Sequence, residues 1–134
     1  MLTGSIFDEL TLSNRDDELV RQIKNAWTNV FRGSRFIPAV EYINANRIRY
    51  KVIRDMAEIM NEIDIYVAPS FERDNLLLTN LTGHPCVVLP NGFTSDVMPA
   101  GITFIGNLFN EGRLIAFAKK FQDATDFHLK HPKL

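Results

Sequence analysis

The chain has one cysteine in 134 residues, and a single thiol excludes an internal disulfide framework. It has no apolar run near the roughly 18 residues that cross a membrane, and no basic-then-apolar pattern at its start. With 15 Lys and Arg against 16 Asp and Glu, the net charge of −1 argues against nucleic-acid binding driven by excess positive charge. We therefore expect a soluble chain that binds neither nucleic acid nor membrane, with the cytoplasm favoured and no compartment fixed.

The hydrophobic content is that of a folded protein. Hydrophobic residues make up 46% of the chain and charged residues 23%, and ten Phe and one Trp supply bulk for a core. A chain of this length buries roughly two-thirds of the surface that it exposes when unfolded. No repeat, low-complexity tract or linker interrupts it. We therefore predict a single domain over residues 1–134, of the α/β class.

Two helices are predicted in the N-terminal half. Ser13 is a suitable N-cap for the first, which has acidic residues in its first turn and ends at Gly33. Ser34 is a suitable cap for the second, with Pro38 in its first turn, and an apolar stripe continues this helix to about Ile63. At about 26 residues it spans ~39 Å, against a radius of gyration of ~14 Å for a compact chain of this size. The apolar residues on one face of the first helix are Leu19, Val20, Ile23, Trp27 and Val30.

The second half predicts a few short strands and a last helix. Residues 64–69 form a short β-type run that ends at a proline. Residues 86–90 are a continuous apolar run, which is typical of a strand buried on both faces. Residues 101–106 form another strand, close enough to the second for antiparallel pairing. Residues 110–127 carry apolar side chains at helical spacing.

Two candidate chemistries involve His84 and Cys86. A Cys/His nucleophile needs the imidazole within hydrogen-bond reach of the thiol, but Pro85 separates the two and the thiol opens an apolar strand, so a core cysteine is the simpler interpretation. A zinc site could add His128 and His131, yet no CxxC or HExxH spacing is present, and a polar tail is the favoured interpretation of that pair.

The remaining candidates are weaker still. The basic cluster could grip phosphates, but acidic residues share its helix and a solvated or subunit-facing surface is favoured. No serine lies in a Gly-x-Ser-x-Gly or Ser-x-x-Lys pattern. We therefore predict no catalytic residue, metal ligand or cofactor site from the residues alone. The basic cluster is Arg47, Arg49, Lys51 and Arg54.

Several segments in order resemble the C-terminal part of the amidase signature family, which includes glutamyl-tRNA amidotransferase A subunits and fatty-acid amide hydrolases. The resemblance covers roughly Phe7 to Pro132. It is carried by residues 31–42 (FRGSRFIPAVEY), 64–70 (DIYVAPS), 79–85 (TNLTGHP), 101–106 (GITFIG) and 111–127.

The resemblance implies a partial amidase-signature fold: two N-terminal helices with the second one long, short strands of a mixed sheet and a C-terminal helix. The family uses a Ser–cis-Ser–Lys triad from an upstream Gly/Ser-rich stretch, which has no counterpart in this sequence. The resemblance thus implies a C-terminal segment of an amidase acting on non-peptide carbon–nitrogen bonds, inactive by itself. Its partner would be the missing catalytic part, and a stand-alone binding or assembly module remains the alternative.

The resemblance also implies a supporting site and a tendency to associate. Polar residues of the 79–85 segment would wall the substrate pocket of the intact enzyme, although a turn that satisfies backbone groups around Pro85 is the favoured role for them. Strands meant for a larger sheet would leave an open edge, so we expect a homo-oligomer. The candidate pocket residues are Thr79, Asn80, Thr82, Gly83 and His84.

Overall fold

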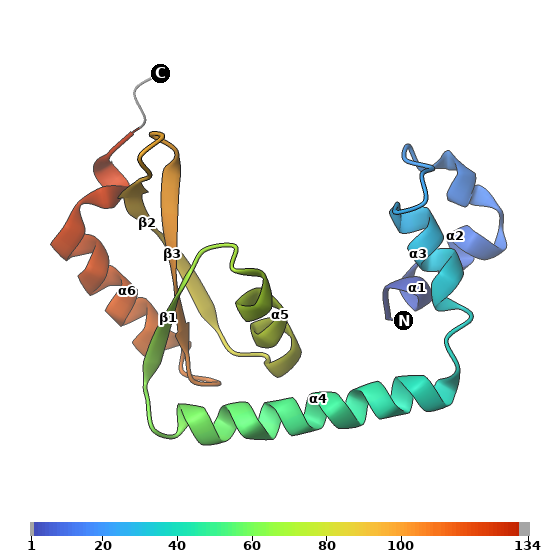
Figure 1. The fold of residues 1–134 in the computed structure, drawn as a ribbon, viewed down its shortest axis with the longest axis horizontal. Coiled ribbons are helices and arrows are strands. Elements are labelled where there is room, and N and C mark those ends of the chain that lie inside the picture. Colours follow the sequence, from blue (N-terminus) through green and yellow to red (C-terminus); the bar gives the residue numbers. More distant parts are fainter. Residues whose placement is uncertain (1, 132–134) are drawn as a thin grey trace. The chain divides into compact units, whose positions relative to one another are not determined.

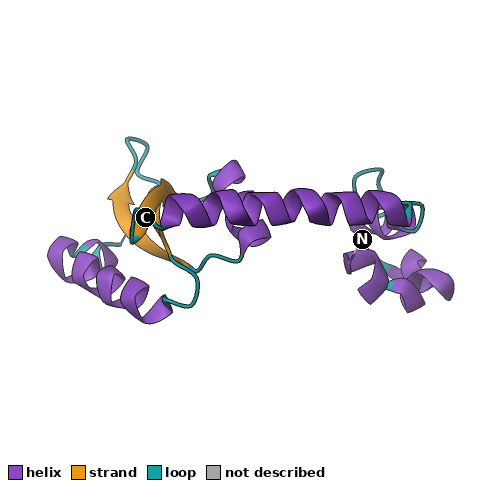
Figure 2. Cartoon of the chain, turned by 90° about the horizontal axis from the view of Figure 1, so that it is seen from below, coloured by secondary structure: helices purple, strands orange, loops and turns teal. Residues whose placement is uncertain are grey.

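The computed structural model describes residues 2–131 (Figure 1). The chain forms two compact units, unit 1 over Met1–Ile48 and unit 2 over Arg49–Leu134. The fold class is mixed α/β, as predicted: unit 1 is helical, and unit 2 holds a three-stranded sheet with helices beside it (Figure 2). Within the described residues, no helix is both long and apolar enough to cross a lipid bilayer.

Unit 1 is built from short helices that pack around one phenylalanine. Phe31 is buried, and its ring stacks on that of Phe7 with 4.6 Å between centroids and lies 5.9 Å from Trp27. Gly4 lies so close to Ser34 that a side chain at position 4 would collide with the serine, which brings the first helix against the third. The elements are α1 (Leu2–Ile6), α2 (Asp8–Leu12), the 3₁₀-helix η1 (Arg15–Glu18) and α3 (Trp27–Ser34).

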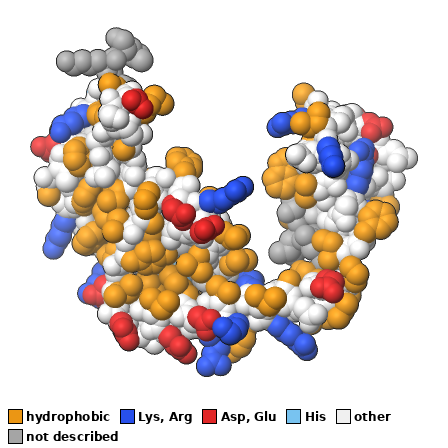
Figure 3. All heavy atoms as spheres, in the orientation of Figure 1, with side chains coloured by type: hydrophobic (Ala, Val, Ile, Leu, Met, Phe, Trp, Pro, Cys, Tyr) orange, Lys and Arg blue, Asp and Glu red, His pale blue; other side chains and the backbone are white. Residues whose placement is uncertain are grey.

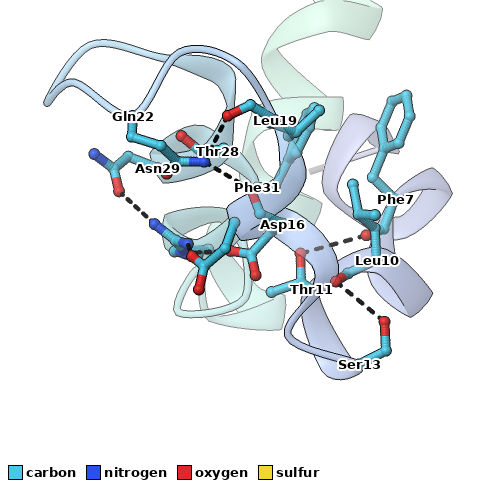
Figure 4. Close-up of polar contacts among 12 residues, drawn as sticks. Phe7, Leu10, Thr11, Ser13, Asp16, Leu19, Gln22, Thr28, Asn29 and Phe31 are labelled. Carbon is cyan, nitrogen blue, oxygen red and sulfur yellow. Dashed lines mark hydrogen bonds and ion pairs between the residues drawn. The ribbon is translucent and has the colours of Figure 1, made fainter.

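The single helix predicted between Ser13 and Gly33 is wrong. Asn14 takes the left-handed backbone conformation at φ 56°, and residues 19–26 are not helical. A side-chain amide there hydrogen-bonds to backbone carbonyls: Gln22 Nε2 donates to the carbonyls of Asp16 (2.8 Å) and Leu19 (2.9 Å). These bonds replace helical ones, so the apolar periodicity of the segment was misleading (Figure 4).

A buried carboxylate ties this irregular segment to α3. The Asp16 side chain is 5% exposed and forms an ion pair with Arg32, which also reaches Asp17 at 3.0 Å. The ion pair lies within unit 1, where it fixes η1 against α3.

The long helix is confirmed as α4 (Ala39–Met60), an uninterrupted element of 22 residues where about 26 were predicted. Its predicted cap is wrong, because Ser34 is the last residue of α3 and its hydroxyl donates to the Phe31 carbonyl at 2.7 Å. The residues of α4 up to 48 belong to unit 1 and the others to unit 2. Every residue from 39 to 51 is exposed, whereas Met56 and Met60 are buried in unit 2. Lys51 and Asp55 lie one helical turn apart and form an ion pair, with 2.9 Å between Nζ and Oδ2.

Unit 2 is organised around an antiparallel sheet of order β1-β3-β2. All three predicted strands are present, as β1 (Ile65–Pro69), β2 (Cys86–Phe93) and β3 (Pro99–Gly106). Ile105 of β3 faces Tyr66 on one side and Cys86 on the other. β2 and β3 form the predicted antiparallel pair, and the described strands supply no parallel pair of the mixed sheet that the family fold implies.

Helices α5 (Arg73–Thr82) and α6 (Glu111–Thr125) lie on opposite faces of this sheet (Figure 1). On the α6 face, Phe104 packs edge-on against Phe117 and Phe121, each at 5.1 Å between ring centroids. On the α5 face, the Tyr66 hydroxyl donates to Asn75 Oδ1 at 2.8 Å. The core of unit 2 is therefore centred on β3, where Phe104 is 5% and Ile105 0% exposed.

β2 is not the strand buried on both faces that its apolar run predicted. It lies at the edge of the sheet, and its residues alternate between partly buried and exposed. Val88 is 59% exposed, and Cys86 is an exposed free cysteine. The described residues thus leave several apolar side chains of this strand exposed.

Candidate functional site

The five predicted pocket residues lie where α5 ends and the chain enters β2. Thr79, Asn80 and Thr82 belong to α5 itself, so they form a helix end and not the loop that the sequence suggested. Gly83 is the C-cap at φ 84°, a left-handed conformation that favours glycine, and its N–H donates to the Thr79 carbonyl at 2.8 Å.

Most of these polar groups bond locally. The Thr79 hydroxyl donates to the carbonyls of Asn75 (3.1 Å) and Leu76 (3.2 Å), and the exposed Asn80 amide also donates to Leu76 (2.8 Å). These three contacts serve the helix. Thr79, Thr82 and His84 are nevertheless buried, which places a small polar cluster inside unit 2.

A hydrogen-bond chain fixes the tautomer of His84. The Thr82 hydroxyl donates to the Leu78 carbonyl at 2.9 Å, so its only proton is committed. The contact of 2.9 Å between His84 Nδ1 and Thr82 Oγ1 is then one in which Nδ1–H donates. Neutral His84 therefore carries its proton on Nδ1 and keeps a lone pair on Nε2.

Burial lowers the pKa of His84 below the ordinary value of 6.5. As pH falls through about 6.5, the unfolded chain takes up a proton before the folded one does. We expect the free energy of unfolding of unit 2 to decline as pH falls from about 6.5 to the lower folded-state pKa. Urea denaturation between about pH 5.5 and 7.5 measures this slope.

Two variants assign the slope to this imidazole. His84→Asn removes the titrating group, and we expect its slope over the same pH range to be shallower. His131→Asn alters an exposed histidine and is expected to leave the slope as it is in the unaltered chain. A slope that is unchanged in His84→Asn would contradict a buried, neutral His84.

The structure gives no support to a Cys86–His84 nucleophile. The Cys86 thiol lies 3.6 Å from the backbone carbonyl of His84, and the ring nitrogen Nδ1 is engaged with Thr82. Among residues 2–131, no group of three or more His, Cys, Asp and Glu side chains gathers as a metal site would require. The described residues therefore assemble neither a Cys/His nucleophile nor a zinc site.

A cavity of about 160 Å³ between α5 and the sheet was not predicted as a unit. Its polar wall includes Ser70 and Thr103, whose hydroxyls lie 3.2 Å apart. The sequence placed Ser70 in a family-like segment, but only the pairing of β1 with β3 brings it to Thr103. The residues that line the cavity are Pro69, Ser70, Phe71, Glu72, Asn75, Leu76, Thr79, Cys86, Val88 and Thr103.

The cavity wall is suited to binding and not to bond cleavage. Ser70 has a hydroxyl as its partner and no base, and Glu72 accepts the Asn75 N–H as the N-cap of α5 (2.5 Å). Burial, with a smaller effect of Cys86, raises the pKa of Tyr66, so its phenol stays protonated and donates to Asn75. No nucleophile–base pair is present at this wall among the described residues.

Arg49 links α4 to the end of α5. Its Nε donates to the Leu81 carbonyl at 2.7 Å, next to Thr82. A cation at a helix C-terminus interacts favourably with the helix dipole and with carbonyls that have no helical partner. One member of the basic cluster thus has a structural partner, and Lys51 pairs with Asp55.

Comparison with known proteins gives a consistent relationship. The chain is 32% identical to the glutamyl-tRNA(Gln) amidotransferase A subunit of Thioalkalivibrio sulfidiphilus in an alignment of 111 residues that covers 69% of this chain. It is 43% identical to the protein of the same name from Cupriavidus taiwanensis in an alignment of 70 residues that covers 52% of the chain. It is 26% identical to the protein of the same name from Vesicomyosocius okutanii in an alignment of 145 residues that covers 94% of the chain. The chain belongs to the amidase signature family.

The relationship covers only part of the family fold. The chain spans 23%, 13% and 30% of the length of these three relatives, which is consistent with a C-terminal fragment. No protein-family model matches the chain.

Proposed function

We propose that this chain acts as the C-terminal segment of an amidase-signature enzyme that hydrolyses non-peptide carbon–nitrogen bonds, and that it does not catalyse by itself. The observation that carries this proposal is the match of 69% of the chain to 23% of a relative named as an amidotransferase subunit. The Ser–Ser–Lys chemistry of the family has no counterpart in this sequence. Its partner is then the catalytic part of the fold.

In this proposal the cluster at the end of α5 supports the substrate pocket. Thr79, Asn80, Thr82, Gly83 and His84 form one wall, and the cavity beside Ser70 extends it. Thr79 supplies the contact between the two, because it lies in the cluster and lines the cavity. The wall positions substrate and takes no part in breaking the amide bond.

An amide-hydrolysis assay on the chain alone tests this proposal. We expect no release of ammonia from a simple amide, and release once the chain is joined to an upstream amidase part that carries the Ser/Lys region. Turnover by the chain alone would contradict the proposal. If Cys86→Ala or His84→Ala abolished such turnover, the Cys/His interpretation would replace it.

A stand-alone assembly module is the second candidate, supported by the exposed first half of α4. Ile43 is 52%, Ile48 67% and Tyr50 64% exposed on this helix. Such side chains suit a partner surface, including one on a second copy of the chain. Light scattering at high concentration tests self-association, and a monodisperse monomer counts against it.

A further inference from the structure

Regular pairing between β2 and β3 covers only part of β2. Gly106 N–H donates to the Pro85 carbonyl at 3.0 Å, and hydrogen-bonded pairs alternate along antiparallel strands. Val87 and Leu89 therefore hydrogen-bond to β3. The same alternation would place the next hydrogen-bonded position of β2 at Asn91.

A β-bulge lies at this position instead. The register shifts between Pro90 and Phe93. Two residues of β2, Asn91 and Gly92, there face the single residue Ala100 of β3. Gly92 has a φ of 89°, a left-handed conformation that favours glycine. Because a bulge disrupts the ladder locally, the Asn91–Gly92 step is held less firmly than the paired residues before it.

The Asn91 side chain is accessible to reaction. It is exposed, and within the part of the chain that the structure describes no hydrogen bond engages its amide. By contrast, the side-chain amides of Asn46, Asn80 and Asn107 each donate to a backbone carbonyl. These bonds hold the amide carbon of those three residues in place, whereas the Asn91 side chain is free to rotate.

The residue after Asn91 is the one least able to obstruct a reaction there. No other asparagine in the sequence precedes a glycine. Gly92 has no Cβ, so its backbone nitrogen can approach the carbonyl carbon of the Asn91 side chain without a steric barrier. Asn61 and Asn110, by comparison, each precede a glutamate. Sequence, exposure and the bulge thus coincide at one step of the chain.

We propose that Asn91 is a site of spontaneous modification, converted to aspartate and isoaspartate by ring closure onto Gly92. The Gly92 nitrogen forms a bond to Asn91 Cγ, and the side-chain nitrogen leaves as ammonia with the proton that the Gly92 amide loses. Water then opens the cyclic imide. Opening at Cγ gives aspartate, and opening at the backbone carbonyl gives isoaspartate, whose main chain passes through Cβ. The inference concerns the chain's own residues and does not depend on the proposed function.

Both products change the surface beside the bulge. A groove of about 660 Å³ borders Gly92, and Lys130 is the only charged residue among the described residues that line it. Hydrophobic side chains gather on the visible face of unit 2 (Figure 3), and residues 86–93 carry no charge. The modification therefore adds a carboxylate to an uncharged strand, and isoaspartate also lengthens its main chain.

Mass spectrometry of the chain incubated at neutral pH tests the proposal. We expect Asn91 to be converted before any other asparagine, at a rate within about 10-fold of that in a peptide of residues 88–95, because the bulge does not lock the step. Both aspartate and isoaspartate should form, and the rate should rise with pH because the Gly92 nitrogen must lose its proton. Amide protection at Val87 and Leu89 shows that the chain stays folded during the incubation.

Three results would overturn the inference. One is a rate in the folded chain more than about 10-fold below that of the peptide, which would mean that the strand locks Asn91. Another is earlier conversion at a different asparagine. The last is aspartate without isoaspartate, which would indicate direct hydrolysis of the amide in place of ring closure.

Two variants assign the reaction to this pair of residues. Asn91→Gln keeps an exposed amide but requires a larger ring, so we expect ammonia loss at this position to slow by about 10-fold or more. Gly92→Ala keeps Asn91 and adds a Cβ beside the attacking nitrogen, and we expect a similar decrease.

The alanine variant needs a check on folding, because its Cβ would take a φ of 89° and lie 3.4 Å from Phe127 Cε1. Protection at Val87 and Leu89 supplies this check, and if it is lost, the same substitution in the peptide decides. A rate that is unchanged in either variant would contradict attack by the Gly92 nitrogen on Asn91.

Discussion

Replacing Phe104 with alanine is expected to lower the free energy of unfolding of unit 2 by about 3–5 kcal/mol. The side chain is 5% exposed and contacts Phe117 and Phe121 from the centre of the sheet. Its removal leaves a cavity between β3 and α6 and deletes two edge-to-face aromatic contacts. Hydrogen exchange at Val87 and Leu89 reports the loss, because these amides open only when β2 separates from β3.

The matched control is Phe109→Ala. Phe109 is 93% exposed, so its truncation removes little packing and is expected to change stability by less than about 0.5 kcal/mol. A similar small effect of Phe104→Ala would show that α6 does not pack on the sheet as described. The comparison keeps residue type and substitution constant and varies burial.

Arg32→Ala is expected to destabilise unit 1 by about 2–4 kcal/mol, because it leaves the buried Asp16 carboxylate without its ion-pair partner. The Asp16 side chain is 5% exposed, against 38% for Arg32, so the cost comes mainly from the uncompensated carboxylate. Trp27 is the single tryptophan and lies in unit 1 beside Phe31. Its fluorescence during urea denaturation measures unit 1 alone.

Two further variants separate the ion pair from the surface contact. Asp17 is 81% exposed, and Asp17→Ala is expected to cost less than about 0.5 kcal/mol. The double variant Arg32→Ala with Asp16→Asn removes both charges and should recover part of the lost stability. Equal losses from Arg32→Ala and Asp17→Ala would contradict a buried Asp16.

The strands were predictable because their signals are local. Residues 64–69 and 101–106 combine β-branched or aromatic residues with a proline or glycine at the boundary, and both are strands. The segment 76–82 has no clear period in its sequence, since leucines next to threonines satisfy either one. It is a helix because Glu72 caps it and Gly83 ends it.

The N-terminal error has a different cause. An apolar period of three to four residues extends through residues 19–30, but amides of Gln22 and Asn29 bond to the backbone carbonyls of that segment. Competition between side-chain and helical hydrogen bonds leaves no mark on hydrophobic spacing. Periodicity alone therefore overstated the helix.

The sequence predicted which residues belong to the candidate site, but it did not predict how the fold brings them together. The family-like segment contains the residues around His84, whereas the contact of Ser70 with Thr103 depends on strand register between residues 33 positions apart. The apolar run of β2 correctly indicated a strand, but hydrophobic composition alone does not distinguish an edge strand from a strand buried on both faces.

The turnover of a chimera tests the central claim most directly. In it, the segment of the Thioalkalivibrio sulfidiphilus relative that matches this chain is replaced by the chain's own residues. Hydrolysis of a simple amide is then compared with that of the unaltered relative and of a version lacking the segment. We expect the chimera to retain turnover within about 10-fold of the unaltered relative, and the deleted version to show none. A folded chimera as inactive as the deletion would contradict the account.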